Sequence, residues 1–420
     1  MAKSGLEVLK ERGFISQCTD MDALEKLMDS ERVTFYVGVD PTGKSLHIGH
    51  MVPFFAMHHL QKAGHRPIAV VGGGTSMIGD PSGKSDMRQM LTIGQIQENA
   101  ASLKDQLGKI IDFSEGQALM VNNYDWLGGL NYLEFLRDIG IHFSVNRMLS
   151  FESYKQRLEK GLNFIEFNYQ LLQSYDFLKL HQDHGCKMQM GGDDQWGNIV
   201  AGMELIRRVE GSEAEAFGLT FPLVTRADGK KMGKTEKGAV FLDPEMFSPY
   251  EFFQYWRNVA DADVGKFLKF FTFLDMEEIA ELEKLEGSEI NKAKERLAYE
   301  QTMIIHGKEE ADKALEAAKA AFTSGGGAGA GLGVRDKDAI PSVDVPASEL
   351  EAGIGIMDLF ARTGLCASRG EARRLVQQGG ARVNEVQIKD INAVIGSDSV
   401  EAGEILLKAG KKRYFRVVSK

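Results

Sequence analysis

Residues 33–50 read VTFYVGVDPTGKSLHIGH, and this stretch determines the fold that we predict. Apolar side chains alternate with other residues from Val33 to Val39, the period-two pattern of a β-strand with one polar face. The strand ends at Asp40-Pro41, and HIGHMVPFFAMHHLQKAGH at 47–65 has the pattern of a helix. RPIAVVGGG at 66–74 reads as a buried strand that runs into glycines. Strand, helix and strand in this order predict a parallel α/β sheet.

The rest of the chain divides by pattern into further parts. A length of 420 residues indicates several domains, because single cores seldom exceed roughly 250–300 residues. We expect an α/β catalytic domain at 1–230, with a helical insertion at about 123–180, and an α-helical domain at 231–323. A glycine-rich flexible linker at 324–344 and a small α+β module at 345–420 follow.

The composition excludes several classes of protein. Three cysteines, Cys18, Cys186 and Cys366, lie far apart, so there is no CxxC pair, zinc spacing or disulfide framework. No run approaches the ~18 apolar residues of a membrane span, and the first residues lack a signal-peptide pattern. We therefore expect a soluble protein of the cytoplasm without a structural metal.

The charge of the chain is unevenly distributed. The net charge is −10, which argues against a general nucleic-acid coat. Residues 351–420 hold 12 Lys/Arg and 8 Asp/Glu, a charge of +4, which leaves −14 for the preceding part. The tail could therefore contact RNA, although a short basic end is more often simply solvated.

The first chemical cluster is DPTGKSLHIGH at residues 40–50, between the strand and the start of the helix. The unpaired N–H groups and positive dipole end of a helix attract phosphate. His47 and His50 are three apart, so we expect them on one helix face, where they can donate to phosphate oxygens. An isolated HxxH is more often a pair of ordinary surface or core histidines.

The second cluster is KKMGKT at residues 230–235, preceded by Asp228-Gly229. Lys231 and Lys234 are three apart on a glycine-containing loop and can both reach a triphosphate. A lone KKxxK is usually a solvated charge run. Two such clusters in this order, about 180 residues apart, indicate a nucleotide site.

The two clusters resemble the HIGH and KMSKS signatures of class I aminoacyl-tRNA synthetases. YVGVDPTGKSLHIGH, GGGTSMIGDPSGKSDMR, NYQLLQSYDF and GGDDQWGN are similar, in this order, to strings of the bacterial tyrosyl-tRNA synthetase family. The resemblance covers nearly the whole chain. KMGKT differs from KMSKS by Gly for Ser and Thr for Ser, which leaves both lysines and one hydroxyl.

The resemblance implies a Rossmann-like catalytic domain with a tyrosine site. Tyr36 and Asp176 would hydrogen-bond the phenol of the substrate. If phenylalanine entered instead, these two buried polar groups would be left without a hydrogen-bond partner. Tyr169 and Gln173, which share a helix face with Asp176, would converge with Asp80 on the ammonium group. Gln195 would orient the amino acid.

The resemblance also implies an ATP site without a general base, because the attacking carboxylate is already ionised at neutral pH. Asp40 would bind either the ammonium group or a water beside the ribose, and the consequence of Asp193 is unclear. ATP would arrive with Mg²⁺ held by its own phosphates and water. The groups expected to bind ATP are Gly38, Asp40, His47, His50, Gly192, Asp194, Lys231 and Lys234. Those expected to act on the phosphates are Thr42, His47, His50, Lys231, Lys234 and Thr235, with Lys84 and Arg88 on the pyrophosphate side.

The C-terminal module resembles an RNA-binding domain first described in a small-subunit ribosomal protein. This match is carried by Ser368, Arg369, Arg373 and Arg374, and its arginines would hold phosphate, so the implied partner is tRNA(Tyr). The family further implies a homodimer formed through the helical insertion. A tryptophanyl-tRNA synthetase, another nucleotidylyltransferase and an RNA-binding relative without catalysis are the alternatives, and tyrosine-dependent ATP–pyrophosphate exchange separates them.

Overall fold

The computed structural model describes most of the chain, namely residues 3–82, 91–159, 161–227, 229, 232–235, 238–323, 340–401, 403–410 and 413–420. It forms two compact units. The first consists of Met1–Phe247 with Val259–Ala293, and the second of Ser248–Asn258 with Lys294–Lys420. The four-part division expected from sequence stays a prediction.

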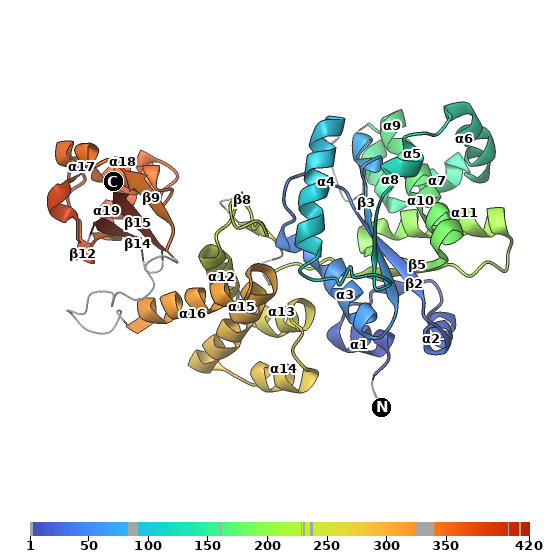
Figure 1. Cartoon of the computed structure of the whole chain (residues 1–420), viewed down its shortest axis with the longest axis horizontal. Helices are drawn as coiled ribbons and strands as arrows, with labels where there is room; N and C mark the ends of the chain where they lie inside the picture. Colours follow the sequence, from blue (N-terminus) through green and yellow to red (C-terminus); the bar gives the residue numbers. More distant parts are fainter. Residues whose placement is uncertain are drawn as a thin grey trace. The chain divides into compact units, whose positions relative to one another are not determined.

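The first unit is built on a six-stranded sheet with the order β1-β6-β5-β2-β3-β4 (Figure 1). All neighbouring pairs are parallel except β1 with β6. The expected parallel α/β sheet is therefore confirmed. The strands are β1 Gln17–Cys18, β2 Thr34–Val39, β3 Arg66–Val71, β4 Leu119–Asn122, β5 Cys186–Gly192 and β6 Phe217–Phe221.

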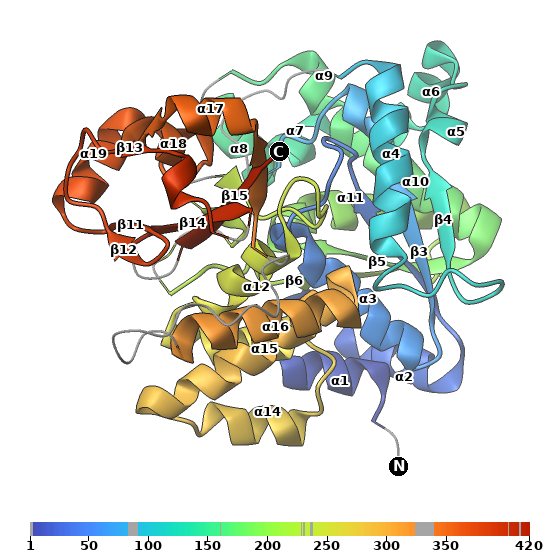
Figure 2. The same cartoon turned by 60° about the vertical axis from the view of Figure 1, so that its left-hand side comes forward.

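Helices cover both faces of this sheet. Strand β3 lies on one side of β2 in the sheet, and β5 lies on the other. Because the crossovers between parallel strands are right-handed, helix α3 (Met51–Lys62) packs on one face of the sheet. Helices α10 (Tyr169–His184) and α11 (Trp196–Glu210) pack on the opposite face (Figure 2). Tyr36, Phe177 and Met203 belong to the buried cluster between the sheet and the second pair of helices. Strand β2, where the direction of winding reverses, is thus buried on both faces.

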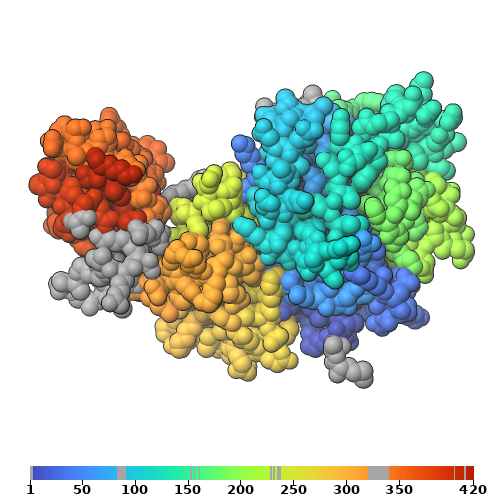
Figure 3. All heavy atoms as spheres, in the orientation of Figure 1, coloured from blue at the N-terminus to red at the C-terminus, as the bar shows by residue number. Residues whose placement is uncertain are grey.

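The segment between β4 and β5 is helical, and part of it is apolar at the surface. Leu133 of α6 is 75% exposed and Phe164 of α9 is 69% exposed. Helix α6 lies at the outer edge of this unit, drawn in teal in Figure 3. The helices before α10 are α5 Tyr124–Leu127, α6 Tyr132–Asp138, α7 Val145–Ser150, α8 Glu152–Leu158 and α9 Phe164–Phe167.

Further helices complete the first unit and begin the second. Arg12, in the N-terminal helix α1 (Gly5–Arg12), is 5% exposed and donates to the carbonyls of Lys269 and Thr272. This guanidinium joins the start of the chain to the region of α13. The other helices of the first unit are α2 Met21–Ser30, α4 Ile93–Leu107, α13 Val264–Phe271 and α14 Met276–Glu283. The second unit contains α12 Pro249–Arg257 and α16 Lys308–Thr323. Helix α15 (Ile290–His306) begins in the first unit and continues in the second.

The C-terminal part of the second unit has its own sheet and core, as the expected α+β class requires. Five strands are ordered β12-β11-β14-β15-β9, and Leu359, Phe360 and Leu407 are among the buried residues beneath them. Asn384 and Glu385 have φ of 46° and 65°, which suits the tight turn between β11 and β12. The elements are β9 Ser342–Val345, α17 Ala347–Ala352, α18 Ile356–Arg362, α19 Arg369–Gln377, β11 Ala381–Val383, β12 Val386–Gln387, β14 Glu404–Ala409 and β15 Arg413–Ser419.

Asp193 ties the edge of the first sheet to the turn that follows β5. Its carboxylate accepts hydrogen bonds from the hydroxyls of Thr220 at 2.6 Å and Ser16 at 2.8 Å and from the amide of Gln17 at 3.2 Å. These partners belong to β6, β1 and the residue before β1. The role that the sequence left unclear is thus a structural one.

We expect Asp193→Ala to destabilise the protein by about 1–3 kcal/mol, because it leaves the fully buried Thr220 hydroxyl without this acceptor. Urea unfolding followed by circular dichroism measures the loss. Glu115→Ala, which removes an exposed carboxylate, is the control. Equal midpoints for the two variants would contradict the role assigned to Asp193.

Candidate active site

The carboxyl ends of β2 and β5 open into a cavity of about 200 Å³. The winding reverses beside β2, and in open parallel sheets such a switch point is the usual place for a ligand. The polar side chains that line the cavity are Tyr36, Asp40, Thr42, His50, Thr75, Asp80, Asn123, Tyr169, Gln173, Asp176, Gln189 and Gln195. The structure therefore brings together in one cavity all six residues expected to bind tyrosine.

One end of the cavity holds a buried phenol and a buried carboxyl group. Tyr36 projects from β2 and is 2% exposed, and among the described residues its hydroxyl has no hydrogen-bond partner. Asp176 on α10 is 4% exposed. Its two oxygens accept from Asn123 Nδ2 at 2.9 Å and from Trp126 Nε1 at 2.7 Å.

Burial changes the proton affinity of these two groups. Removal from water raises the pKa of Asp176 to about 7, and the hydrogen bonds from Asn123 and Trp126 only partly oppose this rise. The charge of Asp40 raises it slightly further. Burial, with the nearby Asp176, also raises the pKa of Tyr36 well above its ordinary value, so the phenol keeps its proton.

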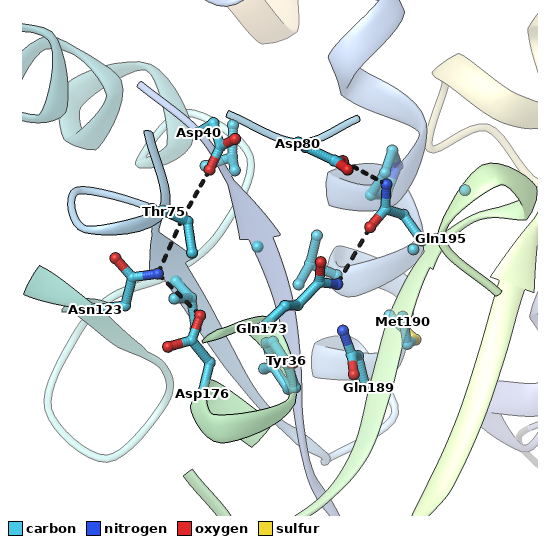
Figure 4. A pocket seen from close by; sticks show the side chains of 18 of the residues that line it. Tyr36, Asp40, Thr75, Asp80, Asn123, Gln173, Asp176, Gln189, Met190 and Gln195 are labelled. Atoms are coloured by element: carbon cyan, nitrogen blue, oxygen red, sulfur yellow. Dashed lines mark hydrogen bonds between the residues drawn. The ribbon is translucent and has the colours of Figure 1, made fainter. Parts of the chain in front are cut away.

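Asn123 and Trp126 are site residues that sequence reasoning missed. Both follow directly after β4, in the string LMVNNYDW at 119–126. Polar residues at the carboxyl end of a parallel strand are a usual signal for a site, but this four-residue strand was not among those predicted. Asn123 also receives the N–H of Gly74 at 2.7 Å and donates to Thr75 at 3.1 Å, which fixes its orientation (Figure 4).

The opposite wall of the cavity is a chain of amides that ends on a carboxylate. Gln195 Nε2 donates to Asp80 Oδ2 at 2.8 Å, and Gln173 Nε2 donates to Gln195 Oε1 at 3.2 Å (Figure 4). The Tyr169 hydroxyl donates to Asp40 at 3.4 Å. Asp40 also accepts from Thr75 at 3.0 Å. Two carboxylates, Asp40 and Asp80, thus face the same cavity.

A second cavity, of about 310 Å³, adjoins the first across Gly38 and Gly192. His47, His50 and Asp194 line it. A Cβ built on Gly38 meets nothing within 4 Å, so this backbone faces open space that a ligand can approach. Gly192 has no such space, because its Cβ would lie 2.6 Å from Asp194 Oδ1.

The expectation that His47 lies on a helix face is wrong. His47 is extended, with φ −120° and ψ 163°, because it forms a β-bridge with Phe241, and helical structure starts at Ile48. The ring nevertheless stacks on that of His50, with centroids 3.8 Å apart. Both Nδ1 atoms accept backbone N–H groups, so the proton of each neutral ring lies on Nε2. These nitrogens are suitable donors to phosphate.

The second motif lies directly beside the first. Ile48 donates its N–H to the Val240 carbonyl at 3.0 Å, and a Cβ on Gly233 would lie 2.9 Å from the Gly49 nitrogen. Gly233 has φ 88°, so a larger residue is disfavoured twice over. Lys234 and Thr235 form β7, which pairs with β8 (Gly238–Ala239), but their side chains are not described. Lys84, Arg88 and Lys231 lie outside the described residues.

Comparison with known proteins agrees with this geometry. The family described as class I tRNA synthetases (W and Y) matches residues 28–323, and a tyrosine–tRNA ligase C-terminal domain family matches 337–417. The tyrosine–tRNA ligase of Treponema denticola is 58% identical over 414 residues, which cover 98% of each chain. The chain belongs to the tyrosine–tRNA ligase family. The ligase of Acetivibrio thermocellus is 55% identical over 99% of both chains.

A solved structure of this ligase family supports the fold of the first part of the chain. A C-terminally truncated mitochondrial tyrosyl-tRNA synthetase of Aspergillus nidulans superposes with a TM-score of 0.67 at 32% identity. The match covers 76% of this chain and 94% of that one. A tryptophanyl-tRNA synthetase of Encephalitozoon cuniculi is only 14% identical, so it shares the fold alone.

In the family's C-terminal domain, the three expected RNA contacts lie on one short helix. Arg369, Arg373 and Arg374 are all exposed on α19, whose first turn is capped by the Ser368 hydroxyl. Arg369 forms an ion pair with Asp358. Arg373 and Arg374 are therefore the better measure of whether this helix binds phosphate.

Within the described ranges, no three His, Cys, Asp or Glu side chains are grouped closely enough to hold a metal ion. The helices of the same ranges include none with the length and apolar composition that crossing a bilayer demands.

We expect the contribution of Asp176 to the stability of the unliganded protein to fall as pH rises from about 4 to 7. The folded protein keeps a proton on Asp176 that the unfolded chain releases near pH 3.8, so folding holds the extra proton and this contribution levels off above pH 7. The loss is on the order of 4 kcal/mol. Urea unfolding of the wild type and of Asp176→Asn, in steps from pH 4 to 8, isolates this contribution. A difference between them that does not vary with pH would refute it.

Proposed function

We propose that this chain is a tyrosine–tRNA ligase that activates L-tyrosine with ATP and then transfers the tyrosyl group to the 3′ end of tRNA(Tyr). The observation that carries the proposal is the buried pair of Tyr36 and Asp176 at the closed end of the cavity. The Tyr36 hydroxyl is the donor for the substrate phenol oxygen. The Asp176 carboxylate is the acceptor for the phenol proton.

This pair selects tyrosine by its unmet hydrogen-bonding capacity. Phenylalanine would leave the Tyr36 hydroxyl and the Asp176 carboxyl group buried against a ring edge that cannot hydrogen-bond. Leaving a buried polar group unpaired costs about 1–3 kcal/mol, and more for a charged one. Asn123 and Trp126 prevent the carboxyl group from turning away to find another donor.

The amino and carboxylate groups of tyrosine lie at the other end of the cavity in this proposal. Asp80 binds the ammonium group, with Tyr169, Gln173 and Gln195 completing its surroundings. The ribose, and the part of ATP that lies against the protein backbone, are bound by Gly38, Asp40, Gly192 and Asp194. The substrate carboxylate is thereby directed toward the second cavity, where His47 and His50 lie.

In the first step an oxygen of the tyrosine carboxylate bonds to the α-phosphorus of ATP while the bond to pyrophosphate breaks. The nucleophile is already ionised, so the residues contribute by positioning and by stabilising negative charge on the phosphates. Mg²⁺ bound to ATP would neutralise part of the phosphate charge. The residues that we assign to the phosphates are Thr42, His47, His50, Lys231, Lys234 and Thr235, with Lys84 and Arg88 toward the pyrophosphate.

The transfer step requires tRNA, and we assign its binding in part to α19. Residues 351–420 carry a charge of +4 against −14 for the preceding part, so they are the part of the chain that attracts a polyanion. Folded RNA is held mainly through phosphate contacts and shape, which exposed arginines suit.

We further propose a cytoplasmic homodimer formed through the helical segment between β4 and β5. Apolar side chains gather at its surface, where an isolated chain would expose them to water. These residues and their exposures are Tyr132 57%, Leu133 75%, Ile141 77%, Val145 55%, Leu158 48% and Phe164 69%. Sedimentation at micromolar concentration tests the assembly, and a monomer would refute it.

Tyrosine-dependent exchange of pyrophosphate into ATP tests the proposed activation step directly. We expect exchange with tyrosine and little with tryptophan or phenylalanine at equal concentration. Charging of tRNA(Tyr) with labelled tyrosine tests the second step. Exchange that depends on tryptophan instead would sink the proposal.

We expect Tyr36→Phe and Asp176→Asn each to reduce the preference for tyrosine over phenylalanine by about tenfold or more, because each removes part of the buried polar pair. The measurement is the ratio of kcat/KM for the two amino acids in pyrophosphate exchange. Tyr154→Phe is the matched control, since the Tyr154 hydroxyl donates to the Phe167 carbonyl and Tyr154 does not line the cavity. Unchanged ratios in both test variants would rule out the phenol assignment.

We expect the double variant Arg373→Ala, Arg374→Ala to lower tRNA charging about tenfold at physiological salt while leaving pyrophosphate exchange unchanged. Loss of two phosphate contacts should also flatten the dependence of charging on salt concentration. Lys284→Ala removes an exposed lysine at the C-cap of α14 in the first unit and serves as the control. Charging at the full rate with the same salt dependence would show that these arginines do not bind tRNA.

A further inference from the structure

Asn198 lies behind the amide wall of the cavity and does not line the cavity itself. It belongs to α11 and is 3% exposed. Its Nδ2 atom donates to Gln173 Oε1 at 3.0 Å and to Gln195 Oε1 at 3.2 Å. The same nitrogen is 3.3 Å from Ser82 Oγ. One buried amide thus contacts both glutamines of the cavity.

The direction of these hydrogen bonds is determined from behind. Gln170 Nε2 donates to the carbonyl of Gly197 at 3.2 Å and to Asn198 Oδ1 at 3.4 Å. A carbonyl can only accept, so the Gln170 amide must turn its nitrogen toward Gly197 and Asn198. Asn198 must then turn its oxygen toward Gln170 and its nitrogen toward the cavity.

The orientation of the Gln170 amide leaves another polar atom without a hydrogen bond. With its nitrogen directed at Gly197, Gln170 leaves its Oε1 buried with no partner among the described residues. Gln170 is fully buried, so water does not compensate. The reversed amide would place oxygen against the Gly197 oxygen, which is worse.

We infer that Asn198 is a positioning residue for the amino group of the substrate. Because Asn198 donates to Gln195 Oε1, Gln195 must present its Nε2 to Asp80, to which it donates at 2.8 Å. Asp80 is held on its other oxygen by the N–H of Ser82 at 2.8 Å. Asn198 therefore acts through Gln195 to hold the carboxylate where an ammonium group can reach it. The inference rests on the proposed function, in which Asp80 binds that ammonium group.

Loss of Asn198 would let the Gln195 amide rotate. A rotated amide presents Oε1 to the Asp80 carboxylate, and the two oxygens repel each other. Asp80 then turns away from the ammonium position, while the phenol end, held by Asn123 and Trp126, is unaffected. Ligands with and without an ammonium group should therefore respond differently.

The test compares L-tyrosine with 3-(4-hydroxyphenyl)propionate, which keeps the phenol and carboxylate but lacks the amino group. Two variants remove the donor and keep the number and branching of the side-chain heavy atoms: Asn198→Leu, which makes no hydrogen bond, and Asn198→Asp, which can only accept. Ser174→Ala is the control on α10, since this buried hydroxyl donates to the backbone carbonyl of Gln170 at 2.7 Å. Affinities are measured on the full chain by calorimetry or by inhibition of pyrophosphate exchange.

We expect both Asn198 variants to bind tyrosine at least tenfold more weakly, with less than a twofold change for the propionate and for the KM of ATP. The control should change neither ligand. Equally weaker binding of both ligands would show a general collapse of the site, and unchanged binding would show that Asn198 positions nothing. Either result overturns the inference about Asn198. Pyrophosphate exchange by the wild type would in that case still support the proposed function. Failure of the wild type to bind tyrosine would instead overturn the proposed function and this inference together.

Discussion

Burial of the Asp176 carboxyl group is the constraint from which the closed end of the cavity follows. A carboxyl group removed from water needs donors nearby, and Asn123 and Trp126 supply one to each oxygen. Those donors come from the turn after β4, so the sheet must extend to β4 to place them. Asn123 is in turn held by Gly74, in the turn after β3. The segments that follow β3 and β4 are therefore arranged around a single carboxyl group of α10.

The same arrangement explains why the glycines gather at the ends of the strands. A Cβ on Gly72 would lie 2.2 Å from Asp40 Oδ1, and one on Gly73 would lie 2.2 Å from Asn122 Oδ1. A Cβ on Gly74 would lie 2.9 Å from Leu127. A larger residue in the turn after β3 would therefore force the side chains of Asp40, Asn122 or Leu127 to move. This close packing keeps Asp40 and Asn123 oriented without a bound ligand.

Much of the fold and the chemistry of the site could be predicted from sequence, because those signals are local. The alternation from Val33 to Val39 predicted β2 and placed Tyr36 on its polar face. The spacing of Tyr169, Gln173 and Asp176 predicted a shared helix face, and all three line the cavity. The two phosphate motifs, 180 residues apart, do lie side by side.

What could not be predicted depends on contacts between distant segments. Asn123 and Asp176 are 53 residues apart, and the two partners of Asp193 near the N-terminus are 176 and 177 residues from it. His47 is extended because of its bridge to Phe241, which no local pattern encodes. Asn198 lies in the string GGDDQWGN, but the positioning role that we infer for it depends on the orientation of neighbouring side-chain amides. That orientation is set by tertiary contacts and is not encoded in a local pattern.

In the function that we propose, the two ends of the cavity would recognise tyrosine by different physical means. At the phenol end the Tyr36 hydroxyl has no hydrogen-bond partner among the described residues, so the ligand can supply this hydrogen bond. At the amino end the hydrogen bonds are already made: Gln195 and the Ser82 N–H each occupy an oxygen of Asp80. An unsatisfied group discriminates because a wrong ligand leaves it unpaired, whereas a satisfied carboxylate attracts any ammonium. Selectivity for the side chain therefore resides in the buried pair, and the amide chain contributes affinity and orientation that every amino acid could use.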